Sequence, residues 1–128
     1  PIDDRRGIPK MIFKGTLEHF SEDTLARFRR RMCGSSGQTE EFLSRTPTRT
    51  AEELREELAA LAQGITAYGS SSFIWDRAII GNRDKIFPPR NQHEAWQGTE
   101  IMETEAEHYE TSLFSRLLEG KGEEWTRH

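Results

Sequence analysis

The sequence predicts an α/β fold, or the related α+β class, with a small sheet of three or four short strands and three amphipathic helices packed on it. Three stretches carry apolar residues at helical spacing, and shorter stretches between them alternate between apolar and polar residues, as strands do. The predicted order is strand, helix, helix, hairpin, helix. The 128 residues fit a single domain, with residues 1–9 as a loosely held arm and residues 121–128 as a flexible tail.

The first two predicted elements are a short strand and a well-marked helix. The segment 10–16 places Met11 and Phe13 on one face, which indicates a strand. Ser21 has the side chain expected of a helix N-cap, and Gly34 is the residue expected just after a helix end. The apolar positions of this helix are Leu25, Phe28 and Met32.

The next stretch contains one ambiguous segment and one clear helix. Residues 39–45 fit either a short helix or a strand. Thr50 and Glu53 form a capping-box pattern that predicts the start of the second helix, and Gly64 is its expected end. The apolar stripe of this helix is Leu54, Leu58, Leu61 and Ile65.

The remaining chain is predicted to hold a hairpin and the third helix. Residues 65–68 and 72–80 alternate as strands, and the turn 69–71 between them favours an antiparallel hairpin. Residues 86–87 are a candidate for a further short strand. A long amphipathic helix is predicted over residues 100–119.

Composition narrows the classes of protein that this chain can represent. Charged residues make up 31% of the chain and hydrophobic residues 34%, with a formal net charge of −4. The single cysteine, Cys33, rules out an internal disulfide and argues against a secreted, disulfide-stabilised scaffold. No segment approaches the roughly 20 apolar residues of a membrane span. We therefore expect no membrane partner and a cytoplasmic location.

The sequence predicts that the protein is not an enzyme, because no catalytic, cofactor-binding or metal-ligating set of residues is evident. Cys33 lies at a predicted helix C-terminus, where the dipole opposes a thiolate, so we interpret it as inert. Glu105 and His108 have the Glu-x-x-His spacing of di-iron sites, but only one such pair is present. Both are therefore interpreted as part of a solvated helix face, and His93 shows no metal-type spacing.

Two surfaces are candidates for contacts with other molecules. Arg27, Arg30 and Arg31 fall on one side of the first helix and are the predicted nucleic-acid contact, with a solvated face as the alternative. Tryptophan and arginine are enriched at interface hot spots, although such rings also fill protein cores. The predicted protein interface is Trp75, Arg77, Ile79, Phe87 and Trp96.

In its size, its Pro1 start and its overall character, the chain resembles the minor core protein of the polymerase complex in double-stranded RNA bacteriophages, the cystoviruses. No residue motif carries this resemblance, so it transfers no functional residues. It implies a dimeric, non-enzymatic factor in capsid assembly and RNA genome packaging, located inside the virion.

The leading hypothesis from the sequence is a non-enzymatic assembly or interaction protein. Its expected partners are a second copy of itself in a homodimer, other viral core proteins and RNA, without a cofactor. One alternative is an accessory protein that contacts nucleic acid through its basic residues. A second alternative is a small enzyme whose site is built from scattered residues such as His93, Glu94 and Cys33.

Overall fold

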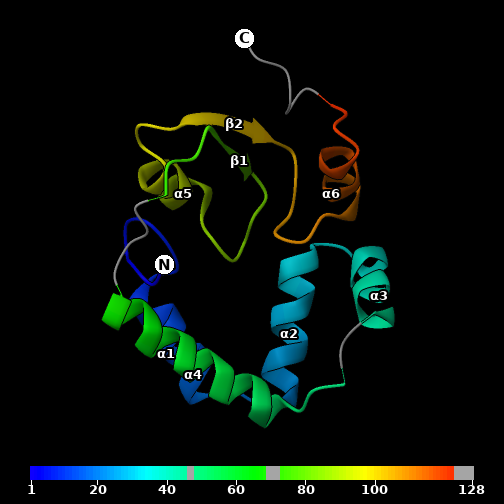
Figure 1. Ribbon diagram of the computed structural model, residues 1–128. Coiled ribbons are helices and arrows are strands. Elements are labelled where there is room, and N and C mark those ends of the chain that lie inside the picture. Colours follow the sequence, from blue (N-terminus) through cyan, green and yellow to red (C-terminus); the bar gives the residue numbers. More distant parts are fainter. Residues whose placement is uncertain (46–47, 69–72, 123–128) are drawn as a thin grey trace.

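The computed structural model describes residues 1–45, 48–68 and 73–122 and confirms the α/β class (Figure 1). Six helices and two strands lie in the described residues, and the single-domain organisation with a loose arm and tail stays a prediction. In chain order the elements are α1 Lys10–Glu18, α2 Glu22–Cys33, α3 Ser36–Ser44, α4 Ala51–Tyr68, β1 Arg77–Gly81, α5 Pro89–Ala95, β2 Glu100–Thr104 and α6 Thr111–Leu118.

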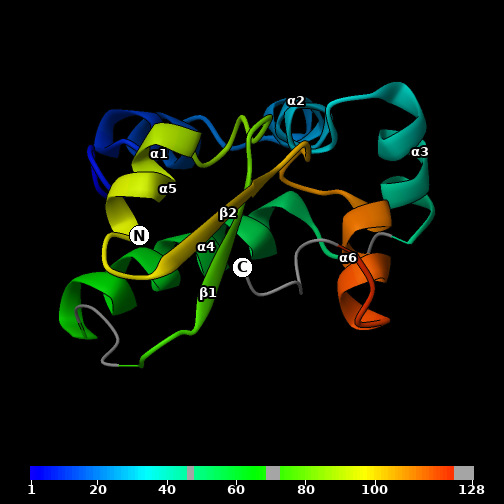
Figure 2. The ribbon, with the colours of Figure 1, turned by 90° about the horizontal axis from the view of Figure 1, so that it is seen from above.

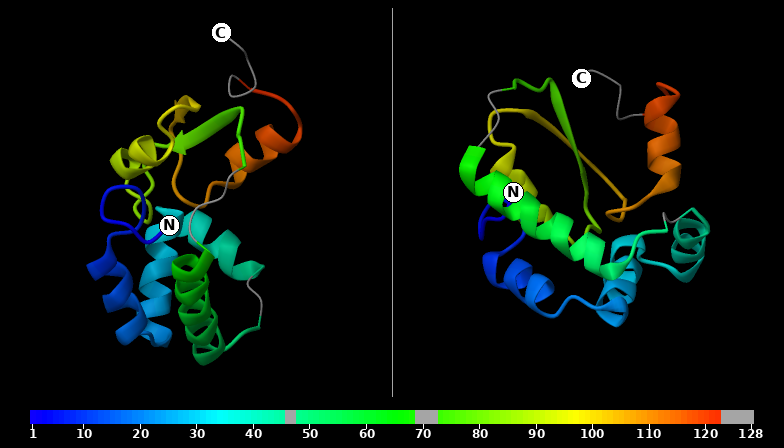
Figure 3. Two further views of the ribbon diagram at one scale, coloured as in Figure 1. Left: turned by 60° about the vertical axis from the view of Figure 1, so that its left-hand side comes forward. Right: turned by 60° about the horizontal axis from the view of Figure 1, so that its bottom comes forward.

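The elements form two groups on opposite sides of the molecule. Helices α1 to α4 lie on one side, and the strands with α5 and α6 lie on the other (Figures 1 and 3). Figure 2 shows α1 with α5 at one end and α3 with α6 at the other. The first end is joined by an ion pair of 2.7 Å between Arg5 and Glu94, and the second by a hydrogen bond of 3.2 Å from Thr111 to Glu41.

The predicted starts of α2 and α4 and the predicted end of α2 are confirmed. The Ser21 side chain accepts a hydrogen bond from the Thr24 N–H at the start of α2, and Gly34 ends the helix with a φ of 77°. At the start of α4, the Thr50 N–H donates to Glu53 at 2.9 Å and the Glu53 N–H donates back to the Thr50 hydroxyl at 3.1 Å. These short-range contacts need no tertiary partner, which is why the sequence was sufficient to predict them.

Two strand assignments from the sequence are wrong, and the segment that was left open between a helix and a strand is a helix. The predicted strand 10–16 lies in α1, and the predicted strand 65–68 lies in the last turn of α4, which continues past Gly64. The segment 39–45 lies mainly in α3, which begins one turn earlier at the Ser35 cap. Short apolar runs fit a buried helix face as well as a strand, and packing decides between them. The predicted turn 69–71 lies outside the described residues.

The two strands pair in parallel rather than as a hairpin. Arg77 lies opposite Glu100 and Gly81 opposite Thr104, and a crossover containing α5 connects the strands. The predicted helix over 100–119 is therefore a strand, a loop and the shorter α6. Its first segment pairs with β1. The helical spacing of apolar residues gives no sign of such a long-range partner.

Gly81 sets the spacing between the two loops that follow the strands. A Cβ atom at this position would lie 2.6 Å from the carbonyl oxygen of Ala106, closer than any ordinary contact. Beyond Gly81, the Asn82 N–H donates to the Thr104 carbonyl at 2.9 Å, and the Arg83 N–H donates to the Ala106 carbonyl at 3.1 Å. The two loops therefore run side by side past the ends of the strands.

Few of the described residues are buried. Separately, none of the described helices is long and apolar enough to cross a membrane. Ile80 of β1 is fully buried, and Ala106 is 1% exposed. The remaining buried apolar residues are Leu25, Cys33, Ala78, Ile86 and Leu113. The most completely buried part of the chain is therefore the region around the strand ends and their loops.

Asn91 holds the amino-terminal loop against α5. It is only 1% exposed, and its amide donates to the carbonyls of Gly7 at 2.8 Å and Asp4 at 3.2 Å. The loop leads directly into α1, so this clamp fixes where α1 begins relative to α5.

Replacing Asn91 with alanine is expected to lower the free energy of unfolding by about 1–3 kcal/mol, because the buried Gly7 carbonyl loses its donor. Chemical denaturation measures the change. The control is Gln97→Ala, which removes an exposed amide bonded to Glu94 and should change stability by less than about 0.5 kcal/mol. Equal changes in both variants would contradict the clamp.

Candidate functional site

Asp84 lies in the loop that follows β1, and its carboxylate is held on both oxygens. Oδ1 accepts hydrogen bonds from the N–H groups of Ile86 at 2.8 Å and Phe87 at 2.9 Å. Oδ2 accepts one from the Gln92 amide at 3.3 Å. The side chain is 9% exposed. This carboxylate therefore has one defined orientation.

His108 lies in the loop that follows β2 and meets the same carboxylate. Its Nδ1 lies 3.0 Å from Oδ2 of Asp84, although 24 residues separate the two in sequence. The contact exists because the strands are parallel, so their carboxyl ends lie at the same edge, and because the two loops are bonded to each other beyond Gly81.

The electrostatics of the pair indicate which of the two side chains carries the proton of their shared hydrogen bond. Burial of Asp84 would raise its pKa, but hydrogen bonds from His108 and from the N–H groups of Phe87 and Ile86 outweigh burial and hold the pKa below its ordinary value. An ionised carboxylate only accepts hydrogen bonds, so Nδ1 of His108 is the donor. In the neutral ring, Nε2 then carries a free lone pair. That is the state of a general base.

The surroundings of His108 fix the ring as well as its proton. The Phe87 ring stacks on the imidazole, with centroids 5.6 Å apart and planes inclined by 20°. The next residue, Tyr109, donates its N–H to the Met32 carbonyl at 3.0 Å, which ties the loop to the end of α2. The His108 side chain remains 31% exposed, so one side of it is open.

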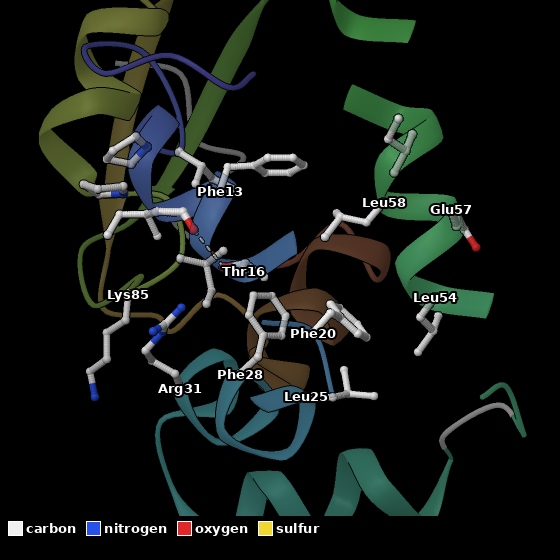
Figure 4. A pocket seen from close by; sticks show the side chains of 16 residues that line it. Phe13, Thr16, Phe20, Leu25, Phe28, Arg31, Leu54, Glu57, Leu58 and Lys85 are labelled. Carbon is white, nitrogen blue, oxygen red and sulfur yellow. Dashed lines mark hydrogen bonds between the residues drawn. The ribbon is translucent and has the colours of Figure 1, made fainter. Parts of the chain in front are cut away.

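A cavity of about 440 Å³ lies between the helices and the loop that carries Asp84 (Figure 4). Its walls come from four parts of the chain: the start of α1, one face of α2, one face of α4, and residues 85, 86 and 88. The volume is within the roughly 300–1,000 Å³ of small-molecule sites. Because Lys85 and Ile86 follow Asp84 directly, the loop of the acid is itself a wall of the cavity.

The lining of this cavity is mostly apolar. Figure 4 shows Phe13 of α1, Phe28 of α2 and Leu58 of α4 gathered around one space. Two cations also line it, Arg31 and Lys85. The stripes predicted for α2 and α4 thus face a cavity as well as a core, which explains why Leu61 remains 55% exposed. An apolar chain with a polar end fits this lining.

The predicted contact residues lie in different places. Arg27, Arg30 and Arg31 are exposed on α2, and Arg31 reaches the cavity. Phe87 is stacked on His108, whereas Trp75 and Trp96 contact each other edge to face at 6.4 Å. Arg77 pairs with Glu100 at 2.7 Å, and Ile79 is half-buried in β1. As contact surfaces for other molecules, both sets stay predictions.

The other candidates of the sequence do not join this site. Cys33 is fully buried, and burial raises the pKa of its thiol, which opposes a nucleophilic role. Glu105 pairs with Arg83 at 2.7 Å, and His93 with Glu103 at 2.9 Å. Within the part of the chain that the structure describes, no group of three or more His, Cys, Asp or Glu residues is placed to hold a metal ion.

The sequence interpretation missed Asp84 and dismissed His108 as part of a solvated helix face. One signal was available for Asp84, because it follows three residues after an apolar run that ends in glycine. A carboxylate just past a buried strand end is a common position for a functional group in parallel sheets. No comparable signal marks His108, since its strand was mistaken for a helix.

Most of the chain is similar to proteins of one family. The sequence model of a family described as pimeloyl-ACP methyl esterase BioG matches residues 1–119. The crystal structure of BioG from Haemophilus influenzae has a TM-score of 0.80 and 41% identity, covering 88% of this chain and 53% of that one.

Two curated relatives match over nearly the same stretch. A malonyl-[acyl-carrier protein] O-methyltransferase of Bacteroides fragilis is 48% identical over 120 residues, which are 92% of this chain and 24% of that protein. An uncharacterized protein of Haemophilus influenzae is 42% identical over 117 residues, 90% of this chain and 54% of that protein. The chain thus spans about half the length of the Haemophilus proteins and about a quarter of the Bacteroides protein.

These matches overturn the viral interpretation. The resemblance to a cystovirus core protein is wrong, because the relatives come from bacteria and both the matching family and the Bacteroides relative carry the names of enzymes. The prediction of a non-enzymatic capsid assembly and packaging protein is wrong for the same reason, and viral core proteins and RNA are withdrawn as partners. The homodimer belonged to that interpretation and is not retained. The second alternative, a small enzyme with an unrecognised site, is the nearest of the sequence hypotheses.

Proposed function

The chain belongs to the BioG family of pimeloyl-ACP methyl esterases, and we propose that its Asp84 and His108 are the acid and base of a serine-type ester hydrolase. The observation that carries the proposal is the 3.0 Å contact between the ionised Asp84 carboxylate and Nδ1 of His108. In a Ser-His-Asp triad the acid holds the imidazole in this tautomer, and Nε2 is the base.

The order of the two residues supports this assignment. In α/β-hydrolases the triad runs Ser, then Asp or Glu, then His, with the acid and the histidine in loops after strands of a parallel sheet. Asp84 follows β1 and His108 follows β2, which are adjacent and parallel. The pattern is an analogy at the level of the fold. It places the nucleophile before Asp84.

The nucleophile itself is proposed to come from outside residues 1–128. Asp84 contacts the His108 ring through Nδ1, which leaves Nε2 for a hydroxyl group. The relatives extend well beyond the matched stretch. A serine hydroxyl supplied from that additional region and placed against Nε2 would complete the triad.

The reaction follows from these positions. Nε2 of His108 takes the proton from the serine hydroxyl as its oxygen attacks the ester carbonyl. The tetrahedral intermediate collapses to an acyl-enzyme, and His108 returns the proton to the departing methoxide, which leaves as methanol. Water, deprotonated by Nε2, then releases the acid and restores the serine. Asp84 stays ionised and stabilises the imidazolium at each step.

The cavity is proposed to hold the acyl chain of the substrate. Its apolar walls suit a run of methylene groups, and its position against the loop of Asp84 brings a bound chain toward the acid–base pair. We propose an acyl chain borne by an acyl carrier protein as the substrate class, following the description of the family. A cytoplasmic location is part of this proposal.

The methyltransferase name of the Bacteroides relative is not carried over to this chain. The matched residues make up 24% of that protein, so its name describes a chain about four times longer. The acid–base pair described above also suits removal of a methyl ester by hydrolysis rather than transfer of a methyl group.

The direct test is the release of methanol from pimeloyl-ACP methyl ester by the natural protein that contains this chain. Hydrolysis with formation of the free acid is expected, together with covalent labelling of one serine by a sulfonyl fluoride. The control substrate is the same ester with a chain too long for a 440 Å³ cavity. An absence of both hydrolysis and labelling in folded protein would contradict the proposal.

Filling the cavity should weaken substrate binding. Leu58→Trp places a larger ring among the lining residues and is expected to raise KM for the pimeloyl ester at least about tenfold, because a misfit of a single methylene already costs roughly 1–3 kcal/mol and the indole takes up more space than that. Hydrolysis of an acetyl ester, which needs little of the cavity, should change less than about twofold. Leu118→Trp, at a site 90% exposed, is the control. Equal effects on both esters would contradict the role of the cavity.

A further inference from the structure

Gln92 makes two hydrogen bonds through one atom, and both end on the loop that carries Asp84. It lies in the middle of α5, where its Nε2 donates to Oδ2 of Asp84 at 3.3 Å and to the Phe87 carbonyl at 2.8 Å. The side chain is half-buried. A single amide thus joins the helix to the carboxylate and to the main chain three residues later.

The two residues that accept these hydrogen bonds, Asp84 and Phe87, both contact His108 through their side chains. Oδ2 of Asp84 holds Nδ1 of the imidazole at 3.0 Å, and the ring of Phe87 stacks on the imidazole plane. The carboxylate fixes the ring along its edge, and the phenyl ring fixes it across its face. Gln92 does not line the cavity, and its side-chain hydrogen bonds go to Asp84 and Phe87. We therefore expect its influence on His108 to pass through these two residues.

The orientation of the amide is settled by its partners. The Asp84 carboxylate is ionised and the Phe87 carbonyl carries no hydrogen, so both are acceptors only. An amide turned by 180° would place its own oxygen against both of them. Nε2 must therefore face the loop.

The helix that carries Gln92 gives the amide a fixed base. Pro88 precedes α5 and Pro89 occupies its first turn, where their restricted φ angles suit a helix start. The Gln92 N–H donates to the Pro88 carbonyl at 3.1 Å, and the neighbouring Asn91 is anchored to the amino-terminal loop. The main chain that carries the amide is therefore anchored on both sides of the side chain's contacts.

We propose that Gln92 is a positioning residue, whose amide holds the Asp84 carboxylate and the Phe87 main chain in the arrangement that orients His108. The consequence for ester hydrolysis rests on the proposed function, whereas the consequence for the orientation of His108 does not. Gln92 does not line the cavity, so its role should be the same for every ester.

The test is Gln92→Met, which keeps the length of the side chain and removes both donors. The expected result is a fall in kcat of about 10- to 100-fold, as for a small misplacement of a catalytic group, with KM unchanged within about twofold. Proton NMR gives an independent reading: the low-field signal of the His108 Nδ1–H, assigned by its loss in His108→Ala, should move upfield or broaden. Gln97→Met on the exposed turn after α5 is the matched control and should change neither.

A second variant tests the same role if the first does not fold. If Gln92→Met fails to fold, as judged by thermal unfolding, Gln92→Glu keeps the shape of the side chain and places an oxygen that cannot donate against Asp84 once it is ionised. The same loss of kcat and the same change in the NMR signal are expected at pH 8. A wild-type value of kcat together with an unchanged Nδ1–H signal in the folded variant overturns the proposal.

The two proposals fail in different ways. If the wild-type protein hydrolyses no ester, the esterase proposal is lost, but the NMR signal still reports whether Gln92 orients His108. If the wild type is active and Gln92→Met matches it in kcat and in the signal, only the role of Gln92 is lost. A fall in kcat equal to that of Gln97→Met would also overturn the positioning role.

Discussion

Replacing His108 with alanine is expected to lower kcat for ester hydrolysis by about 10⁴- to 10⁶-fold. Among the described residues, the imidazole of His108 is the base that Asp84 orients, and alanine removes it. KM should change little, since His108 does not line the cavity. Steady-state release of methanol from a methyl ester measures both constants.

The chain supplies a matched control for this variant. His93 also pairs with a carboxylate, Glu103, at 2.9 Å, but both partners are nearly half exposed and neither lines the cavity. His93→Ala should therefore keep kcat within about twofold of the wild type. Comparable losses in the two variants would mean that the contact with Asp84 does not distinguish a catalytic histidine.

Replacing Asp84 with asparagine is expected to lower kcat by about 10⁴-fold while the fold is retained. The amide of asparagine can donate to Nδ1, which would move the ring proton to Nε2 and abolish the base. The oxygen of the asparagine amide can take the place of Oδ1, so the N–H groups of Ile86 and Phe87 would keep their acceptor. Activity should therefore fall much further than stability.

The same variant should change how stability depends on pH. Because the fold lowers the pKa of Asp84, the ionised carboxylate stabilises the protein above the ordinary carboxyl range, about pH 4, and this stabilisation is lost as the pH falls through the lower pKa of the folded state. The difference in unfolding free energy between the wild type and Asp84→Asn should shrink from about pH 6 toward pH 3. Denaturant titrations at several pH values measure it.

Glu103→Gln is the control for this second prediction. It removes a carboxylate that also pairs with a histidine, but one that is 49% exposed, where ion pairs contribute little. It should preserve both kcat and the pH dependence of stability. A kcat for Asp84→Asn within tenfold of the wild type would contradict the role of Asp84 as the acid of the triad.

The helix caps were predicted correctly, whereas several short strands and the pairing of the strands were not. The caps at Ser21, Gly34 and Thr50 were predictable because each rests on residues within one turn. The segment 100–119 was misassigned because its apolar spacing fits a helix, although its first residues pair with β1 instead. The viral resemblance failed because no residue carried it.

By itself, the sequence determined the α/β class, the starts of α2 and α4 and the apolar faces that line the cavity, since these depend on contacts between near neighbours. The tertiary structure alone decided that β1 and β2 are parallel and adjacent. Only that arrangement brings Asp84 to His108, and Gln92 to both the carboxylate and the Phe87 carbonyl. The reason is that β1 and β2 pair across 23 residues of sequence. The spacing of apolar residues along the chain shows the local structure that a segment favours, but not which distant segment it pairs with.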